Sequence, residues 1–228
     1  MNYRKIIYYL REYFFPAGCA SCGGALLEAE NTYYGICKEC RSFLNFHIKF
    51  EESYKKEYSS KYFIRQIGLF PYFGRFKNVL REYKFGKSLA IGNYLSMCLE
   101  NCLKDIITDD FPNISSGTAW VPVPPRPGKI KKEGWDQIAF LSGLLSKSSQ
   151  SIPVKPCLKR LKSKSQKELN KGEREKNLKG RIICVREPPE TAILLDDVIT
   201  TGATLNACAQ ALLEKGTKKI YGVCLFFD

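Results

Sequence analysis

The sequence contains a single histidine, His47, and no apolar run near the roughly 20 residues that a membrane-spanning helix needs. One imidazole leaves little choice of general base for a catalytic site, and we expect His47, near a cysteine cluster, to be structural. Residues 1–15 are interrupted by Arg11 and Glu12, so they lack the apolar centre of a signal peptide. These absences predict a cytoplasmic protein without a membrane span.

Acidic residues are also scarce: 23 Asp and Glu face 36 Lys and Arg, which gives a formal net charge of +13. Such a field attracts polyanionic partners or anionic substrates. Residues 155–181 alone contain eleven Lys or Arg and three Glu, a net charge of +8. The alternative for this segment is a solvated surface loop that binds nothing.

Cysteine, by contrast, is plentiful, and four of the ten form two C-x2-C pairs: Cys19 with Cys22, and Cys37 with Cys40. In a cytosolic chain this spacing favours zinc over disulfides. Four thiolates complete a tetrahedral site without an open position, so the predicted zinc is structural; the alternative is coincidental free thiols. The other six lie in mostly apolar stretches and are predicted to be core residues: Cys98, Cys102, Cys157, Cys184, Cys208 and Cys224.

The chain divides into two predicted units. Residues 1–50 form a small four-cysteine module with an N-terminal helix, and residues 65–228 form an α/β domain. Twenty-one of the 27 Phe and Tyr residues lie within the first 85 positions. They can form a base-stacking surface beside basic groups, but we favour the alternative that a small module needs bulky side chains to build its core.

The C-terminal part of the sequence has the pattern of a β-α-β unit. Residues 192–195 are short and apolar, as in a buried parallel strand. A helix is predicted next, and it ends before Gly216. Apolar residues recur on one face of this helix: Leu205, Cys208, Ala209, Leu212 and Leu213. Residues 220–227 form another strand. The loop after the first strand therefore lies at the sheet edge where open α/β proteins bind ligands.

This loop carries residues suited to a sugar phosphate. Asp196 and Asp197 can accept hydrogen bonds from vicinal sugar hydroxyls or help to hold Mg²⁺. Backbone N–H groups and hydroxyls at a helix N-terminus can surround a phosphate, and the candidates are Thr200, Thr201, Gly202, Ala203 and Thr204. The alternative is an ordinary strand-to-helix turn with two solvated carboxylates.

A second anion-binding loop is predicted upstream. Residues 81–102 are expected to be helical, and residues 120–124 to form a strand that ends in a proline-bracketed turn. A helix is expected over residues 135–147. The loop between this strand and this helix is basic, with Arg126, Lys129, Lys131 and Lys132. A strand, a basic glycine-containing loop and a helix form an arrangement that binds anions.

The run from Ile193 to Leu205 resembles the motif of the type I phosphoribosyltransferases: an apolar run, two acidic residues, two apolar residues, two hydroxyl residues, Gly, any residue and Thr. The resemblance implies a parallel sheet flanked by helices and a site for 5-phosphoribosyl-1-pyrophosphate (PRPP) with Mg²⁺. Asp196 and Asp197 would be the catalytic pair facing the ribose hydroxyls, and residues 200–204 would hold the 5′-phosphate. The basic loop would face the pyrophosphate, and residues from about 160 to 180 would form a flexible lid.

Over almost its whole length the chain resembles the ComF/GntX family. The shared features are Phe15-Pro16 before the four cysteines, Tyr83-Lys84-Phe85, Val121-Pro122-Val123-Pro124, Gly134-Trp135-Asp136-Gln137, Gln166 with Arg174 and Asn177, and Asp196-Asp197. One departure is visible, because the family usually has Arg-Gly-aromatic-Asn-Gln where this chain has acidic Glu133 and Asp136. The resemblance implies a zinc module and a role in natural transformation, handling incoming single-stranded DNA beside a helicase-like partner.

Three functions are therefore considered. We predict a ComF-type, PRPP-binding protein that handles single-stranded DNA during DNA uptake. The alternatives are an active phosphoribosyltransferase with an unidentified acceptor and a PRPP sensor without turnover. The same residues serve binding and turnover, so the sequence does not separate these functions.

Overall fold

The computed structural model describes residues 17–50, 56–57, 60–110, 117–148, 152–162 and 180–228. Its centre is a five-stranded sheet in the order β1-β2-β7-β6-β3. Four strands run parallel, and the short β1 pairs antiparallel with β2; the bounds are β1 (Lys56–Glu57), β2 (Arg65–Pro71), β3 (Thr118–Pro122), β6 (Thr191–Ile199) and β7 (Lys219–Phe227). The predicted α/β class with a parallel sheet is confirmed.

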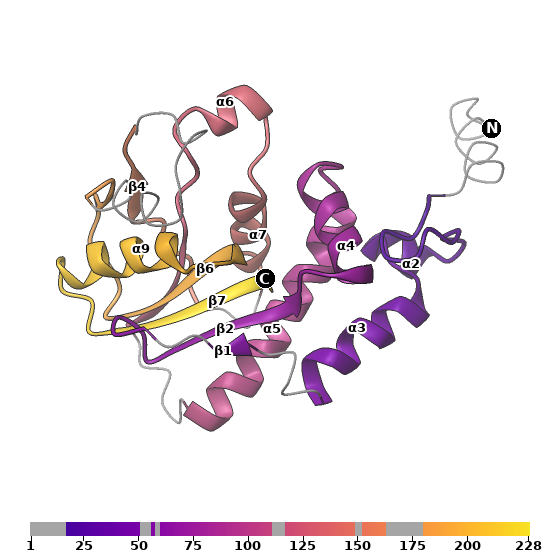
Figure 1. The fold of residues 1–228 in the computed structure, drawn as a ribbon, viewed down its shortest axis with the longest axis horizontal. Coiled ribbons are helices and arrows are strands. Elements are labelled where there is room, and N and C mark those ends of the chain that lie inside the picture. The colour runs from indigo at the N-terminus through magenta and orange to yellow at the C-terminus, as the bar shows by residue number, and fades with distance from the viewer. Residues whose placement is uncertain (1–16, 51–55, 58–59, 111–116, 149–151, 163–179) are drawn as a thin grey trace.

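Helices cover both faces of this sheet (Figure 1). On one face lies α9 (Ala203–Leu213), and on the other lie α4 (Gly74–Lys84), α5 (Leu89–Asp110) and α7 (Gln137–Leu145). Alternate side chains of β6 enter two separate hydrophobic clusters, because successive side chains of a strand point to opposite faces. Leu194 belongs to the cluster of α9, whereas Leu195 belongs to the cluster of the other three helices.

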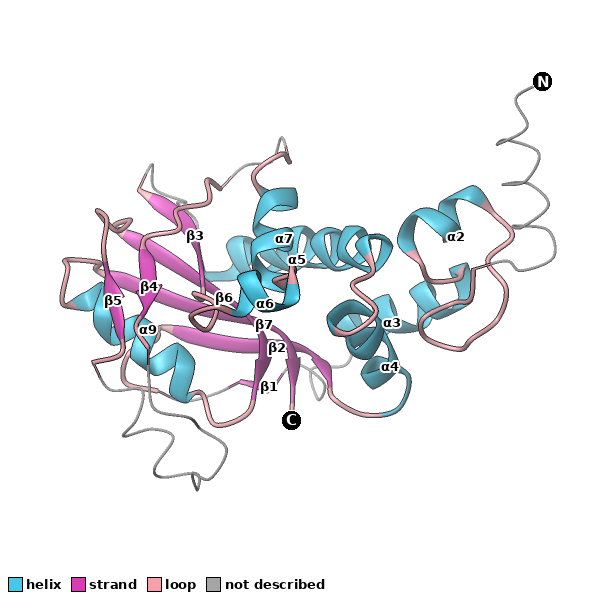
Figure 2. Ribbon diagram, turned by 90° about the horizontal axis from the view of Figure 1, so that it is seen from above, coloured by secondary structure: helices cyan, strands magenta, loops and turns pink. Residues whose placement is uncertain are grey.

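Two smaller elements complete the α/β part. A short helix, α6 (Lys129–Glu133), precedes α7, and an antiparallel pair, β4 (Leu158–Arg160) with β5 (Ile182–Cys184), lies near α9 (Figure 2). The lid predicted over residues 160–180 falls mainly on residues 163–179, outside the described part of the chain. No helix among the described residues is both long enough and apolar enough to cross a membrane.

The four-cysteine module near the N-terminus is present and contains α2 (Ala29–Tyr34) and α3 (Lys38–Phe50). It packs on α4 and α5: Asn78 donates to the carbonyl oxygen of Ser21 at 3.3 Å, and the Tyr94 hydroxyl donates to Oδ1 of Asn45 at 3.0 Å. The helix predicted over residues 1–15 lies outside the described residues. The boundaries at 1–50 and 65–228 remain a prediction.

The single helix predicted over residues 81–102 is wrong, because α4 ends at Lys84 and α5 begins at Leu89. A Cβ atom on Gly86 would lie 2.7 Å from the carbonyl oxygen of Glu82, so only glycine allows this close turn. Lys87 then takes the left-handed conformation, with φ of 52°. The break places Lys84 at a helix end.

Other predicted boundaries differ from the observed ones by a few residues. The strand predicted over 192–195 continues through both aspartates to Ile199, because its pairing with β7 extends to Phe227. The strand predicted over 120–124 is β3, and the helix predicted over 135–147 is α7. Leu213 was predicted on the buried face of α9 but is 37 % exposed. The six cysteines predicted as core residues are all buried.

Candidate functional site

The two aspartates lie at the carboxyl end of β6 and point to opposite sides of it. Asp197 contacts Lys84 of α4 and Gln137 of α7, whereas Asp196 lies within electrostatic reach of Arg160 of β4. The backbone N–H of Asp197 also donates to Oδ1 of Asp196 at 2.8 Å. Adjacent positions thus bring carboxylates to both helical layers of the protein.

Both carboxylates line a cavity of about 650 Å³ at the carboxyl edge of the sheet. A volume of this size suits a small organic ligand. The rest of its wall comes from the proline-rich turn, α6, the first turn of α7, β4 and the start of α9: Lys84, Val123, Pro124, Pro125, Arg126, Pro127, Gly128, Lys129, Lys132, Glu133, Asp136, Gln137, Ile138, Arg160, Val198 and Thr204. The predicted acidic pair, Thr204 and most of the predicted basic loop are therefore brought together.

Asp197 is held by two donors. Nζ of Lys84 lies 2.8 Å from Oδ2 of Asp197, and Nε2 of Gln137 donates to the same oxygen. Oε1 of Gln137 in turn accepts from Nζ of Lys129 at 2.5 Å. Lys129 also contacts Asp136, so a continuous polar network joins α4, β6 and the α6–α7 segment. This network fixes the orientation of Asp197.

Asp196 has a different electrostatic state. Burial, followed by the negative charge of Asp197, raises the pKa of Asp196 from 3.8 to about 8. Asp196 therefore keeps its proton to a higher pH than an ordinary aspartate. A protonated carboxyl can donate a hydrogen bond to a sugar hydroxyl as well as accept one.

Basic side chains form another part of the cavity wall. Arg126, Lys129 and Lys132 come from the predicted basic loop, whereas Lys131 is not among the lining residues. Arg160 joins them from β4, and burial, followed by the positive charge of Arg126, lowers the pKa of Arg160. Two guanidinium groups close enough to affect each other suit an anion that neutralises both.

The predicted phosphate loop leads directly into α9. Gly202 is the N-cap with φ of 72°, a conformation that favours glycine. The backbone N–H of Ala203 donates to the Thr201 hydroxyl at 3.4 Å. A Cβ atom placed on Gly202 would lie 3.8 Å from Nε2 of Gln66, a buried nitrogen for which no acceptor is found in the described structure. Thr204 lines the cavity, whereas Thr200 is exposed in the loop.

Sequence reasoning assigned no role to three cavity residues. Lys84 belongs to the shared segment Tyr83-Lys84-Phe85, and Gln137 belongs to the shared segment Gly134-Trp135-Asp136-Gln137. Arg160 lies at the edge of the expected lid. These residues come from α4, α7 and β4, which are distant from β6 in sequence. The signal that could have found Lys84 and Gln137 was their presence in segments shared with a family, whereas no signal in the sequence pointed to Arg160.

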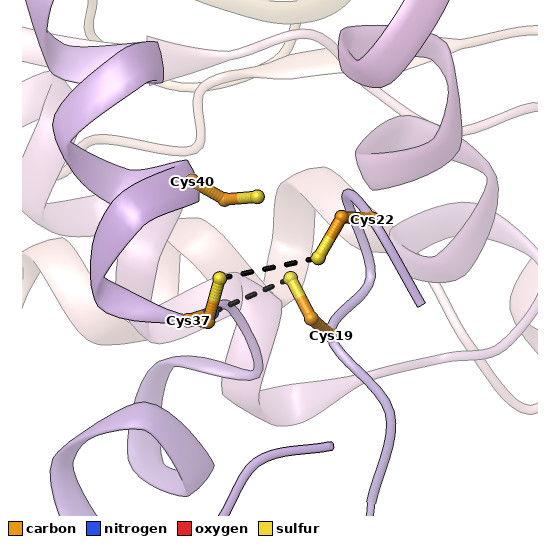
Figure 3. A group of neighbouring side chains, drawn as sticks. All are labelled: Cys19, Cys22, Cys37 and Cys40. Atoms are coloured by element: carbon orange, nitrogen blue, oxygen red, sulfur yellow. Dashed lines mark hydrogen bonds between the residues drawn. The ribbon is translucent and has the colours of Figure 1, made fainter. Parts of the chain in front are cut away.

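The four cysteines of the N-terminal module form a separate, compact cluster (Figure 3). Their sulfur atoms all lie within 4.8 Å of one another, and those of Cys22 and Cys37 are 4.0 Å apart. Tetrahedral Zn–S bonds of about 2.3 Å require sulfur separations of roughly 3.8 Å, so the cluster is compatible with a structural metal such as zinc. Although burial acts to raise it, backbone N–H donors led by that of Cys22 lower the pKa of Cys19 to about 7.

No family model matches the chain. The chain is similar to a curated protein, Competence protein F of Haemophilus influenzae, with 25% identity over 229 residues. The match covers 91% of this chain and 95% of that protein. Together with the four-cysteine cluster, this similarity confirms the resemblance to the ComF family.

Proposed function

We propose that this chain binds PRPP in the cavity at the end of β6 and acts in competence by handling single-stranded DNA during uptake. The observation that carries the proposal is the meeting of an acidic pair, Thr204 of the first turn of α9 and a basic wall in one cavity of about 650 Å³. These features complement a ribose diol, a 5′-phosphate and a diphosphate. The similarity to Competence protein F supports the role in competence.

Each end of PRPP has its proposed partners. Asp196 and Asp197 take the two ribose hydroxyls, and the loop from Thr200 to Thr204 holds the 5′-phosphate through backbone N–H groups and hydroxyls. Arg126 and Arg160 face the diphosphate, where they offset its charge. Mg²⁺ supplies further positive charge at the diphosphate when bound.

Turnover is the second candidate function, supported by the basic wall beside the acidic pair. In this reaction the bond between ribose C1 and the pyrophosphate oxygen breaks, pyrophosphate leaves with the electron pair, and an acceptor atom bonds to C1. The chain would orient the ribose and stabilise charge on the leaving group. PRPP binding with pyrophosphate release for some acceptor among nucleobases, amines and nucleic acids supports turnover; binding without release supports a sensor.

Calorimetric titration of PRPP with Mg²⁺ tests the site. Wild-type protein is expected to bind, and Asp196→Asn/Asp197→Asn is expected to lose binding while remaining folded. Glu187→Gln, an exposed change on the loop before β6, is the matched acidic control and should bind like the wild type. A folded wild type that binds no PRPP overturns the proposal.

The nucleic-acid part of the proposal rests on charge. The chain has a net charge of +13, with +8 in residues 155–181, and phosphate neutralisation gives affinity that falls steeply with salt. A labelled single-stranded oligonucleotide should bind at roughly micromolar concentration and dissociate as salt rises. A helicase-like component of the uptake machinery is the proposed protein partner. Absent or salt-insensitive binding contradicts this part.

Zinc is the metal proposed for Cys19, Cys22, Cys37 and Cys40. The cluster supports it, because four thiolates and no open position are typical of structural zinc sites. Its binding energy would contribute to the folding of the N-terminal module. None of the four cysteines lines the cavity, so this metal would have no direct part in PRPP binding.

A further inference from the structure

We infer that Lys84 takes, at Asp197, the position that a divalent cation would otherwise occupy. Lys84 is then a positioning residue that holds Asp197 in place for a ribose hydroxyl, so the acidic pair recognises the sugar without a metal ion. This inference rests on the proposed PRPP site and specifies where in that site a metal ion can bind. Mg²⁺ would enter only with the diphosphate, at the basic end of the cavity.

The geometry at Asp197 already supplies two donors to one oxygen of its carboxylate. Oδ2 accepts from the ammonium of Lys84 at 2.8 Å and from the amide of Gln137. Two donors use the lone-pair directions of one oxygen. The Asp197 side chain is 14% exposed and that of Lys84 is 25% exposed, so the pair is partly shielded from water. A pair shielded in this way is screened less by water and salt than a pair on the open surface.

The backbone around Lys84 fixes this contact. Lys84 is the last residue of α4, and the preceding Tyr83 is fully buried with its hydroxyl donating to the carbonyl oxygen of Gln137 at 2.5 Å. The end of α4 is therefore attached to the first turn of α7. The Gly86 turn stops the helix directly after this point. Lys84 is thus held at the cavity wall by its neighbours on both sides.

Asp197 fits Mg²⁺ poorly for this reason. Magnesium needs oxygen ligands at about 2.0–2.1 Å in octahedral geometry. An ion bound to Oδ2 would displace the Gln137 donor, and an ion bound to either oxygen of Asp197 would lie within several ångströms of the Lys84 ammonium, where the two cations repel. A sugar hydroxyl is neutral and can donate to the carboxylate without such repulsion. The arrangement therefore favours a diol over a free divalent ion.

Two measurements test this inference. Calorimetry compares PRPP binding by wild type, Lys84→Met and Lys84→Arg, each with Mg²⁺ and with EDTA. Wild type is expected to retain binding in EDTA, Lys84→Met to lose about tenfold or more in EDTA, and Lys84→Arg to recover part of the loss. Lys77→Met, on the exposed side of the same helix, is the control and should bind like the wild type.

The second measurement needs no PRPP. Electron paramagnetic resonance counts Mn²⁺ bound to the ligand-free protein, and Lys84→Met is expected to gain a Mn²⁺ site that wild type and Lys77→Met lack. If Lys84→Met does not fold, Lys84→Gln replaces it, because Gln keeps a donor without the charge. Mn²⁺ binding at Asp197 in wild type, or unchanged PRPP binding by folded Lys84→Met, overturns the inference.

Failure of the proposed function gives a different result. In that case wild type binds no PRPP with Mg²⁺ or with EDTA, and the Mn²⁺ count alone decides the role of Lys84. A Mn²⁺ site gained only on loss of Lys84 still supports its action as a counter-ion. Equal Mn²⁺ counts in wild type and Lys84→Met overturn it.

Discussion

Lys129 and Asp136 form an ion pair of 2.9 Å that closes the loop between α6 and α7. Asp136 is also the N-cap of α7, because its Oδ1 accepts from the backbone N–H of Ala139 at 2.9 Å. The acidic residue that departs from the usual family pattern therefore has a structural role. It stabilises the start of the helix that delivers Gln137 to Asp197.

Replacing the cap tests this role. Asp136→Ala is expected to lower the free energy of unfolding by about 1–2 kcal/mol, because the helix loses its cap and Lys129 loses its ion-pair partner. Asp136→Asn, the residue usual in the family, should retain most of the stability because Asn also caps helices. Urea denaturation measures both variants. Equal losses in the two variants would show that the ion pair, and not the cap, contributes the stability.

Gly202→Ala should weaken PRPP binding. Gly202 has φ of 72°, and a side chain there costs about 1 kcal/mol and tends to shift the loop. Gly216→Ala is the matched control, because Gly216 has φ of 101° at the far end of α9. Both variants should lose similar stability in thermal unfolding, but only Gly202→Ala should lose affinity in calorimetry. An equal affinity loss in both would contradict a phosphate-binding role for the loop.

Arg160→Met should distinguish binding of the diphosphate end of PRPP from binding of its ribose 5-phosphate end. Because Arg160 is proposed to face the diphosphate, this variant should bind PRPP about tenfold or more weakly. Its affinity for ribose 5-phosphate, which has no diphosphate, should match that of the wild type. Calorimetric titration with both ligands makes the comparison. A parallel loss for both ligands would mean that Arg160 stabilises the cavity in general.

The N-terminal module should depend on its metal. Cys37→Ser is expected to lose the bound zinc and to reduce the stability of residues 17–45, because three remaining thiolates bind zinc more weakly. Cys98→Ala, which changes a buried cysteine outside the cluster, should retain one zinc per chain. Elemental analysis gives the stoichiometry. Wild-type protein purified without any metal, yet folded in this region, would refute the zinc prediction.

Asp196 should make stability depend on pH. Its pKa is about 8 in the folded protein and near 3.8 when unfolded, so the folded state holds the extra proton between these values. Its contribution is fully present below about pH 4 and is lost as the pH rises to about 8, by at most about 1.4 kcal/mol per pH unit. Asp196→Asn lacks this dependence, so its stability relative to the wild type should increase from pH 5 to pH 8. Urea denaturation at several pH values would contradict this if the difference stayed constant.

Local sequence patterns predicted the parts of the protein whose residues lie close together in the chain. The spacing of Cys19, Cys22, Cys37 and Cys40 predicted their cluster, because two short turns bring the pairs together. The apolar run before Asp196 likewise predicted a buried strand, because the signal lies within the strand itself. Where a single segment contains both the signal and the structure, the sequence is sufficient.

The contacts of the cavity could not be predicted in this way. Lys84 meets Asp197 only because α4 ends at the Gly86 turn, and apolar residues continue on both sides of that turn as they would in one helix. Arg160 comes within electrostatic reach of Asp196 only because β4 lies beside α9. Both relationships depend on how the layers pack, which no residue spacing within one segment encodes.

The strand order also has a consequence for biosynthesis. Of the strands described, β7 is translated last, yet it lies between β2 and β6 and pairs with both. Until residues 219–227 leave the ribosome, each of those strands has an open edge, which is the kind of surface that promotes aggregation. A ribosome that stalls shortly before this segment would therefore leave a nascent chain with two unpaired halves of a sheet, while the four-cysteine module could already bind its metal.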